Sequence, residues 1–186
     1  GAIHNDDPEA APLWLSPSSF WTQPAGEDHV TAARGAFNMA YIEIDSGPYL
    51  VRPSAEAFDN GERPINVAAS NLVWLDSDDV TFLPVSDGSG AQTAFLWADR
   101  ETGERGSLLR LPAGSSSRIA TGVGPLRAVV TSGGGRYTNP QTTGEVALGA
   151  GSYFGSMGNA VHTISCEAED DCLLYIRTSA VFTLAE

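Results

Sequence analysis

Short apolar runs alternate with turn residues along most of this chain of 186 residues. The runs are rich in Val, Ile, Thr and aromatic residues, and Gly, Pro, Asp, Asn and Ser separate them. Runs of this kind, repeated at intervals of about 8–12 residues, predict the strands of a β-sandwich or barrel. We therefore expect an all-β fold. The expected strands are Trp74–Leu75, Thr93–Trp97, Leu108–Leu111, Arg127–Thr131, Glu145–Leu148, Ser152–Phe154, His162–Cys166, Leu173–Arg177 and Val181–Leu184.

Helical periodicity is nearly absent from the chain. The one helical turn we expect is Ser54–Phe58, which follows a proline and ends before Asn60-Gly61. Gly133–Gly135 stands between two strand-like runs, so we expect a hairpin turn there. A phosphate-binding loop would instead open a helix. Ser115–Ser117 has no histidine and acid arranged in any hydrolase order, so we interpret these residues as loop serines.

The charge balance excludes several function classes. Acidic residues outnumber basic ones 23 to 10, the net charge is −13, and the chain contains no lysine. A chain this acidic repels a phosphate backbone, so we expect no nucleic-acid partner. Without lysine, Schiff-base chemistry and a phosphate-loop lysine are both impossible. No apolar run approaches the about 20 residues that cross a bilayer, so no membrane partner is expected. Nothing in the sequence indicates a compartment.

An internal repeat divides the chain. The segment from Ser19-Phe20-Trp21 to His29 has the same length as the segment from Ser152-Tyr153-Phe154 to His162, and both pass through a turn. A strand-like run follows each copy, at Met39–Glu43 and at Leu173–Arg177. Only the second copy is preceded by a long strand-rich stretch. We therefore expect residues 1–50 to be the back half of a first β-unit, residues 51–70 a linker, and residues 71–186 a complete second unit.

These segments resemble the cupin superfamily, and specifically its uncharacterised bicupins related to the cupin domain of ChrR-type anti-sigma factors. Pro112–Gly114, followed by Arg127–Val130 and Gly133-Gly134, is similar to cupin motif 1 in spacing. Gly151–His162 is similar to motif 2, and Ser18–His29 is similar to motif 2 a second time. The resemblance implies a double-stranded β-helix, the cupin jelly roll, with an N-terminal half-cupin extension. It also implies a ligand pocket in the mouth of the barrel.

The motif 1 positions that bind metal in cupins differ in this chain. Counting from Gly114, the two histidine positions are Ala120 and Gly122, and Arg127 takes the glutamate position. Only the motif 2 histidine, His162, is present in the complete unit. A transition-metal site needs about three or four protein ligands, and a fixed positive charge opposes a divalent cation. We therefore expect no metal and no other cofactor in the complete unit.

We expect the same pocket to bind a small molecule, with anions among the candidates because Arg127 presents a planar, permanently charged guanidinium group. His162 would add a second donor, and Tyr137 and Tyr153 would line the walls. An ion pair between Arg127 and a neighbouring acid is the simpler alternative. The opposing function class is a metal-dependent cupin enzyme, a dioxygenase or isomerase, whose active unit is the first one. In that case His29 would be a metal ligand together with residues from an upstream half, and without that half it is a solvent-exposed histidine. The sequence leaves open whether the protein is an enzyme.

Two further expectations concern covalent and subunit structure. If the chain turns at Ala168–Asp170, Cys166 and Cys172 face each other across two antiparallel strands, at a distance that a disulfide can span. Acidic neighbours raise the pKa of a thiol, so we favour a structural disulfide or buried thiols over redox chemistry. A half jelly roll exposes strand edges and apolar residues such as Trp14 and Tyr41. We therefore expect residues 1–50 to pack on the complete unit, to exchange with a second copy, or both, and we expect the protein to be a homodimer.

Overall fold

A computed structural model describes residues 2–5, 9, 11–45, 47–76, 79, 90–179 and 181–185. The chain divides into two compact units, Gly1–Leu72 and Val73–Glu186. Residues 51–70, expected to be a linker, are part of unit 1. Within the described ranges, no helix has the length and apolar character needed to cross a membrane.

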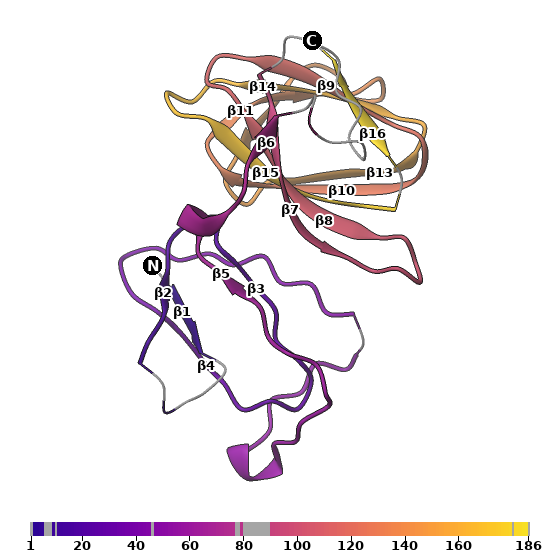
Figure 1. Cartoon of the computed structure of the whole chain (residues 1–186). Coiled ribbons are helices and arrows are strands. Elements are labelled where there is room, and N and C mark those ends of the chain that lie inside the picture. The colour runs from indigo at the N-terminus through magenta and orange to yellow at the C-terminus, as the bar shows by residue number, and fades with distance from the viewer. Residues whose placement is uncertain are drawn as a thin grey trace. The chain divides into compact units, whose positions relative to one another are not determined.

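Unit 2 consists of two antiparallel sheets (Figure 1). The six-stranded sheet has the order β13-β10-β15-β8-β7-β6, and the five-stranded sheet has the order β12-β11-β14-β9-β16. The strands are β6 (Leu75–Asp76), β7 (Gln92–Ala98), β8 (Arg105–Leu111), β9 (Ser116–Thr121), β10 (Val123–Ser132), β11 (Gly134–Thr138), β12 (Val146–Gly149), β13 (Tyr153–Gly158), β14 (Val161–Cys166), β15 (Cys172–Thr178) and β16 (Phe182–Ala185).

One hydrophobic core fills the space between the two sheets. Alternate residues of the strands face it, as the period of a β-strand requires. Its fully or nearly fully buried members include Leu109, Leu111, Ile119, Leu126, Val130, Ile164, Leu174, Ile176, Phe182 and Leu184. Two facing antiparallel sheets with crossed connections form the double-stranded β-helix of the cupins. The predicted fold class is therefore confirmed.

The last strands of unit 2, β13 to β16, form their backbone hydrogen bonds with strands from the first half of the unit. The later strands β13 to β16 pair only with the earlier strands β9, β10, β11 and β8, and never with one another in the described residues. From β8 to β11, and again from β12 to β16, consecutive strands therefore alternate between the two sheets. The hairpin expected at Gly133–Gly135 is consequently wrong, because β10 and β11 lie in different sheets. The chain crosses from one sheet to the other there.

The expected hairpin between the cysteine-bearing strands is wrong for the same reason. Cys166 ends β14 in the five-stranded sheet, and Cys172 begins β15 in the six-stranded sheet. Their sulfur atoms form a disulfide, with a Cα–Cα distance of 5.7 Å. The bond thus connects the two sheets across the loop between β14 and β15, and does not link two paired strands.

Unit 1 contains much less regular structure. β1 (Ala2–Asn5) pairs with β2 (Trp14–Leu15) on one side and with β4 (Val30–Ala33) on the other. β3 (Phe20–Trp21) pairs with β5 (Asn66–Val67), and single 3-10 turns, η1 and η2, lie at Ser54–Glu56 and Ala69–Asn71. The expected helical turn near Ser54 is present, whereas the expected strand at Met39–Glu43 is not.

Candidate functional site

The interior of the unit 2 barrel carries polar side chains at one end of its apolar core. On β14, His162 and Ile164 face the interior, and on β9 Ser117, Ile119 and Thr121 do so. His162 lies opposite Ile119 in the register between these strands, and only 1% of its surface is exposed. A buried histidine needs hydrogen-bond partners, because each unpartnered polar group costs about 1–3 kcal/mol.

A chain of four side chains supplies these partners. The Nδ2 group of Asn139 donates to the hydroxyl of Tyr137 at 2.8 Å. The Tyr137 hydroxyl lies 2.7 Å from Nδ1 of His162, and the Ser156 hydroxyl lies 2.9 Å from Nε2. We call Asn139, Tyr137, His162 and Ser156 the polar chain. It begins just after β11, crosses the barrel through β14 and ends on β13.

Aromatic packing holds the polar chain in place. The ring of Phe154 lies 4.8 Å from that of Tyr137 and 5.2 Å from that of His162, measured between ring centroids. Phe154 and Ser156 are alternate residues of β13, so both face the interior. The imidazole is therefore fixed by an aromatic wall as well as by two hydrogen bonds.

The polar chain contains one hydrogen more than it has acceptors. If Nε2 of His162 carries the proton, Tyr137 donates to Nδ1 and the ring donates to Ser156, so the hydrogen of the Ser156 hydroxyl has no acceptor. If Nδ1 carries the proton, the hydrogen of the Tyr137 hydroxyl has none. Tyr137 is buried and Ser156 is only half-buried. The first arrangement costs less, because its unmatched donor lies where it can meet solvent or a ligand.

Burial lowers the pKa of His162 below its ordinary value of 6.5, because the imidazolium form loses its hydration inside the barrel. The unfolded chain therefore takes up a proton at a higher pH than the folded chain does. The titration of His162 should therefore leave the free energy of unfolding unchanged above about pH 6.5. It should lower this free energy as the pH drops from 6.5 to the lower pKa that His162 has in the folded protein.

This dependence can be isolated by comparing the wild type with His162→Gln. The free energy of unfolding, measured in urea across about pH 7.5 to 5, should fall more steeply for the wild type, by about 1.4 kcal/mol per unit of pKa difference. The acidic residues titrate alike in both proteins, so their contribution cancels. If the free energies of unfolding of the two proteins differ by the same amount at every pH, folding does not lower the pKa of His162.

The structure brings together two of the four predicted ligand-binding residues. Tyr137 and His162 meet in the polar chain, whereas Arg127 and Tyr153 lie on the other face of the six-stranded sheet. Arg127 is exposed and stands between the buried residues Leu126 and Ala128 on β10. Tyr153 is 57% exposed. Ligand binding by Arg127 and Tyr153 stays a prediction, and any such binding would occur outside the barrel.

The positions assigned to the metal ligands are shifted by one residue from the inner face. Strand alternation places Ile119 and Thr121 on the face that His162 shares, and Ala120 between them on the other. Neither an isoleucine nor a threonine that already pairs with Ala160 fits a cupin metal site. In the described part of the chain, no three His, Cys, Asp or Glu side chains gather closely enough to hold a metal ion.

His29 lies in unit 1, next to β4, and is exposed. Its Nδ1 atom lies 3.1 Å from the backbone oxygen of Glu27. The hydroxyl of Ser54 donates to the carboxylate of the neighbouring Asp28 at 2.9 Å. A role for His29 as a metal ligand stays a prediction that depends on residues from another part of the protein.

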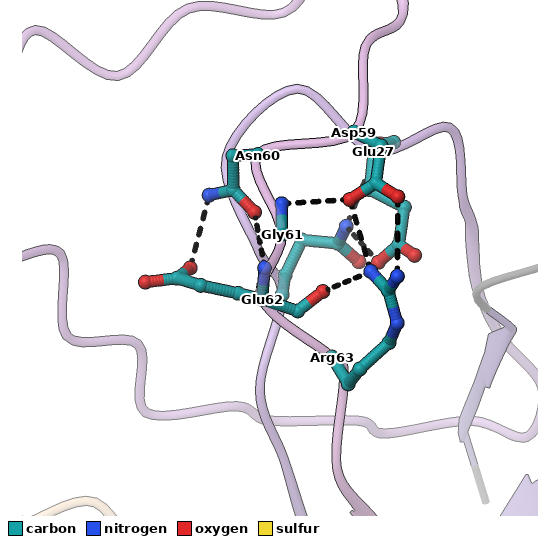
Figure 2. Close-up of polar contacts among 7 residues, drawn as sticks. Glu27, Asp59, Asn60, Gly61, Glu62 and Arg63 are labelled. Carbon is teal, nitrogen blue, oxygen red and sulfur yellow. Dashed lines mark hydrogen bonds and ion pairs between the residues drawn. The ribbon is translucent and has the colours of Figure 1, made fainter.

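A polar turn borders a cleft of about 420 Å³ in unit 1. Figure 2 shows Arg63 directed at Asp59, with its nitrogens 2.9 and 3.2 Å from the two carboxylate oxygens. The hydrogen bond from Arg63, followed by that from the Gly61 amide, lowers the pKa of Asp59. Asn60 bonds both the amide and the carboxylate of Glu62. These polar groups form hydrogen bonds with one another, so we interpret them as stabilising the turn and not as a ligand site.

Two members of the polar chain were not expected from the sequence. Asn139 belongs to no motif, and Ser156 lies within the segment similar to motif 2 but has no role there. Each follows an inward aromatic residue by two positions, Tyr137 and Phe154 respectively. Strand alternation was the available signal for Ser156. Asn139 has no comparable signal, because β11 ends before it.

Comparison with known proteins gives a family and several similar structures. A family model described as "Domain of unknown function (DUF4437)" matches residues 1–185. No match was found among curated proteins. Among solved structures, the chain is similar to an RmlC-like cupin from Ralstonia eutropha, with 14% identity, TM-score 0.47 and coverage of 63% of this chain and 69% of that one.

Two further structures are similar over shorter stretches. An RmlC-like cupin from Shewanella frigidimarina has 12% identity and TM-score 0.45, with 59% of this chain and 85% of that one covered. A protein described as a predicted oxalate decarboxylase from Thermotoga maritima has 18% identity and TM-score 0.42, with 47% and 78% covered.

Proposed function

The chain belongs to the DUF4437 family, whose function is unknown, and from that premise we propose that unit 2 binds a small molecule inside its cupin barrel. The observation that supports the proposal is the polar chain. It lies in an apolar core, burial lowers the pKa of its histidine, and one of its hydroxyl hydrogens has no acceptor within the polar chain. A ligand oxygen, from a carboxylate or a carbonyl group, would supply that acceptor.

The proposed binding does not use a metal at the position typical of cupins. Both ring nitrogens of His162 are engaged by hydroxyl groups, and the inward neighbours on β9 are Ile119 and Thr121. This donor set does not fit a transition-metal centre. The proposal is therefore one of recognition by hydrogen bonds and aromatic contact, and it assigns no reaction to the barrel.

The finer family relationship is also part of the proposal. We propose that residues 1–50, which belong to unit 1, are the back half of a first cupin unit, in the bicupin layout related to the ChrR-type cupin domain. The internal repeat supports this relationship. The strand positions support it as well, because β4 begins directly after His29 and His162 is the second residue of β14. An enzyme centred on His29 gains no support from the described residues, because no set of potential metal ligands surrounds it there.

A titration with three matched aromatic compounds tests the ligand site. Benzoate and benzamide carry acceptor oxygens, whereas protonated benzylamine carries none. We expect the first two to shift the amide resonances of Ser156 and His162, with millimolar to micromolar affinity of about −4 to −8 kcal/mol. Benzylamine should leave both resonances unchanged.

Two variants locate the binding. Ser156→Ala removes the proposed donor and should weaken benzoate binding about tenfold or more, the effect of losing about 1.4 kcal/mol. Arg127→Ala, on the outer face, should bind as the wild type does. Equal binding by wild type and Ser156→Ala, loss of binding in Arg127→Ala, or no shift at His162 with either acceptor compound would contradict the proposal.

A further inference from the structure

Unit 1 exposes an apolar segment that is neither helix, turn nor strand. It comprises residues 36–45, which we call the edge segment. Phe37 is 78% exposed, Met39 51% and Ile42 66%. Scattered exposed apolar residues are normal in proteins, but several within one short segment mark an interaction surface.

One side of the edge segment has unused backbone hydrogen-bonding groups. The hydroxyl of Tyr41 donates to the carboxylate of Glu43 at 3.0 Å, and contact between residues two apart is typical of an extended chain. In an extended chain the backbone groups of alternate residues point to the same side. Within the described residues, the backbone groups of Asn38, Ala40, Ile42 and Ile44 form no hydrogen bond. They form an open edge that another strand can pair with.

The internal repeat shows which kind of structure this segment is suited to form. Met39–Glu43 corresponds in the repeat to Leu173–Arg177, which lies within β15. In unit 2, β15 is a central strand with β10 on one side and β8 on the other. The edge segment therefore has the composition of a central strand, while its own unit supplies no ladder along its open side.

We propose that the edge segments of two copies of this chain pair antiparallel across a twofold axis and form a dimer. Charge selects this arrangement. A parallel pair in register would place Glu43 against Glu43, and like charges directly opposite each other are destabilising. In an antiparallel pair centred anywhere from Ala40 to Ile42, Glu43 and Asp45 lie opposite uncharged residues. This interface is separate from the proposed ligand site in unit 2.

The exposed apolar surface is large enough for such a dimer. The edge segment contributes the exposed residues Phe37, Met39, Tyr41, Ile42 and Ile44 to this surface, and Tyr49, Leu50 and Val51, which follow it in the chain, would have to extend the interface beyond the paired strands. With about 150–250 Å² for each aromatic side chain and somewhat less for the others, they offer roughly 900 Å². A standard stable interface buries about 800 Å² on each partner.

Sedimentation velocity of matched variants tests the proposal. The wild type should be a dimer between about 1 and 100 µM, a range typical of stable interfaces. Ile42→Glu places two charges at the interface and should raise the dimer dissociation constant about tenfold or more. Val123→Glu, at a residue of unit 2 that is 84% exposed, is the control and should dimerise as the wild type does. A monomeric wild type, or an Ile42→Glu variant that dimerises normally, overturns the proposal.

Single cysteines test the antiparallel geometry. The native cysteines are joined in a disulfide, so a new cysteine is the reactive one. Among Ala40→Cys, Tyr41→Cys and Ile42→Cys, the variant at the centre of the pair should form an inter-copy disulfide readily, since opposite residues lie about 4.5–5.5 Å apart. Val123→Cys should not cross-link. Equal cross-linking at all four positions, or none at residues 40–42, overturns the geometry.

Discussion

Gly135→Ala is expected to destabilise unit 2 by about 4 kcal/mol or more, enough to unfold many single domains. Gly135 lies on β11, opposite Cys166 of β14 and Leu148 of β12. A Cβ atom at this position would overlap the backbone oxygen of Ser165, and Cβ contacts under 3.0 Å essentially do not occur. The obstructing atom belongs to a strand that is paired on both sides, so it has no room to move.

Gly149→Ala is the matched control for this prediction. Gly149 ends β12 in the same sheet, and an added Cβ there meets no atom within 4 Å. We expect a change within about 0.5 kcal/mol in the free energy of unfolding, measured by urea denaturation. Equal stability of the two variants would mean that β11 and β14 are not packed as the structure shows.

Tyr137→Phe is expected to cost about 1–3 kcal/mol, although it removes only one oxygen atom. That oxygen partners both Asn139 and Nδ1 of His162, so its loss leaves two polar groups without a partner inside the barrel. Tyr153→Phe is the control, because Tyr153 is exposed on the outer face, and it should change stability by less than about 0.5 kcal/mol. Urea denaturation with an unchanged m-value measures both. A Tyr137→Phe variant as stable as the control would show that the polar chain is not formed in solution.

Most of the fold could be predicted from the sequence, because strand positions leave a local signal. The runs at Thr93–Trp97, Leu108–Leu111, His162–Cys166 and Leu173–Arg177 all lie within observed strands. β9 was missed because serines and an arginine occupy its first half, so the apolar alternation is weak. Composition there favoured a loop, and pairing with β14 and β16 outweighed it.

The pairing of strands could not be predicted from neighbouring positions in the sequence. Cys166 and Cys172 suggested a hairpin because a short polar stretch separates them, but their strands belong to opposite sheets. From β12 to β16 the chain alternates between the two sheets, so strands that follow one another there are not paired, and the partners of β13 to β16 are the earlier strands β8 to β11. Local patterns report burial and turns, and they carry no information about which sheet a strand joins.

The candidate site shows the same division between local and long-range information. His162 was singled out by its motif, and Tyr137 was grouped with it as a residue of the wall. Arg127 was placed in the same pocket by spacing alone, yet strand alternation turns it outward, since Leu126 and Ala128 on either side are buried. A shift of one residue reverses the face of a strand, so motif spacing has to be checked against the burial of the neighbours.

The proposed ligand binding requires a neutral His162 inside the barrel and a ligand oxygen that reaches the hydroxyl of Ser156. The most direct measurement is a long-range ¹H–¹⁵N spectrum of the His162 imidazole, recorded between about pH 7 and 5.5 with and without benzoate. We predict that the ring is neutral at pH 7 with the proton on Nε2, that it takes up a second proton only below pH 6.5, and that its signals shift when benzoate is added. A ring that becomes protonated near pH 6.5, or one that does not respond to benzoate, would contradict the account.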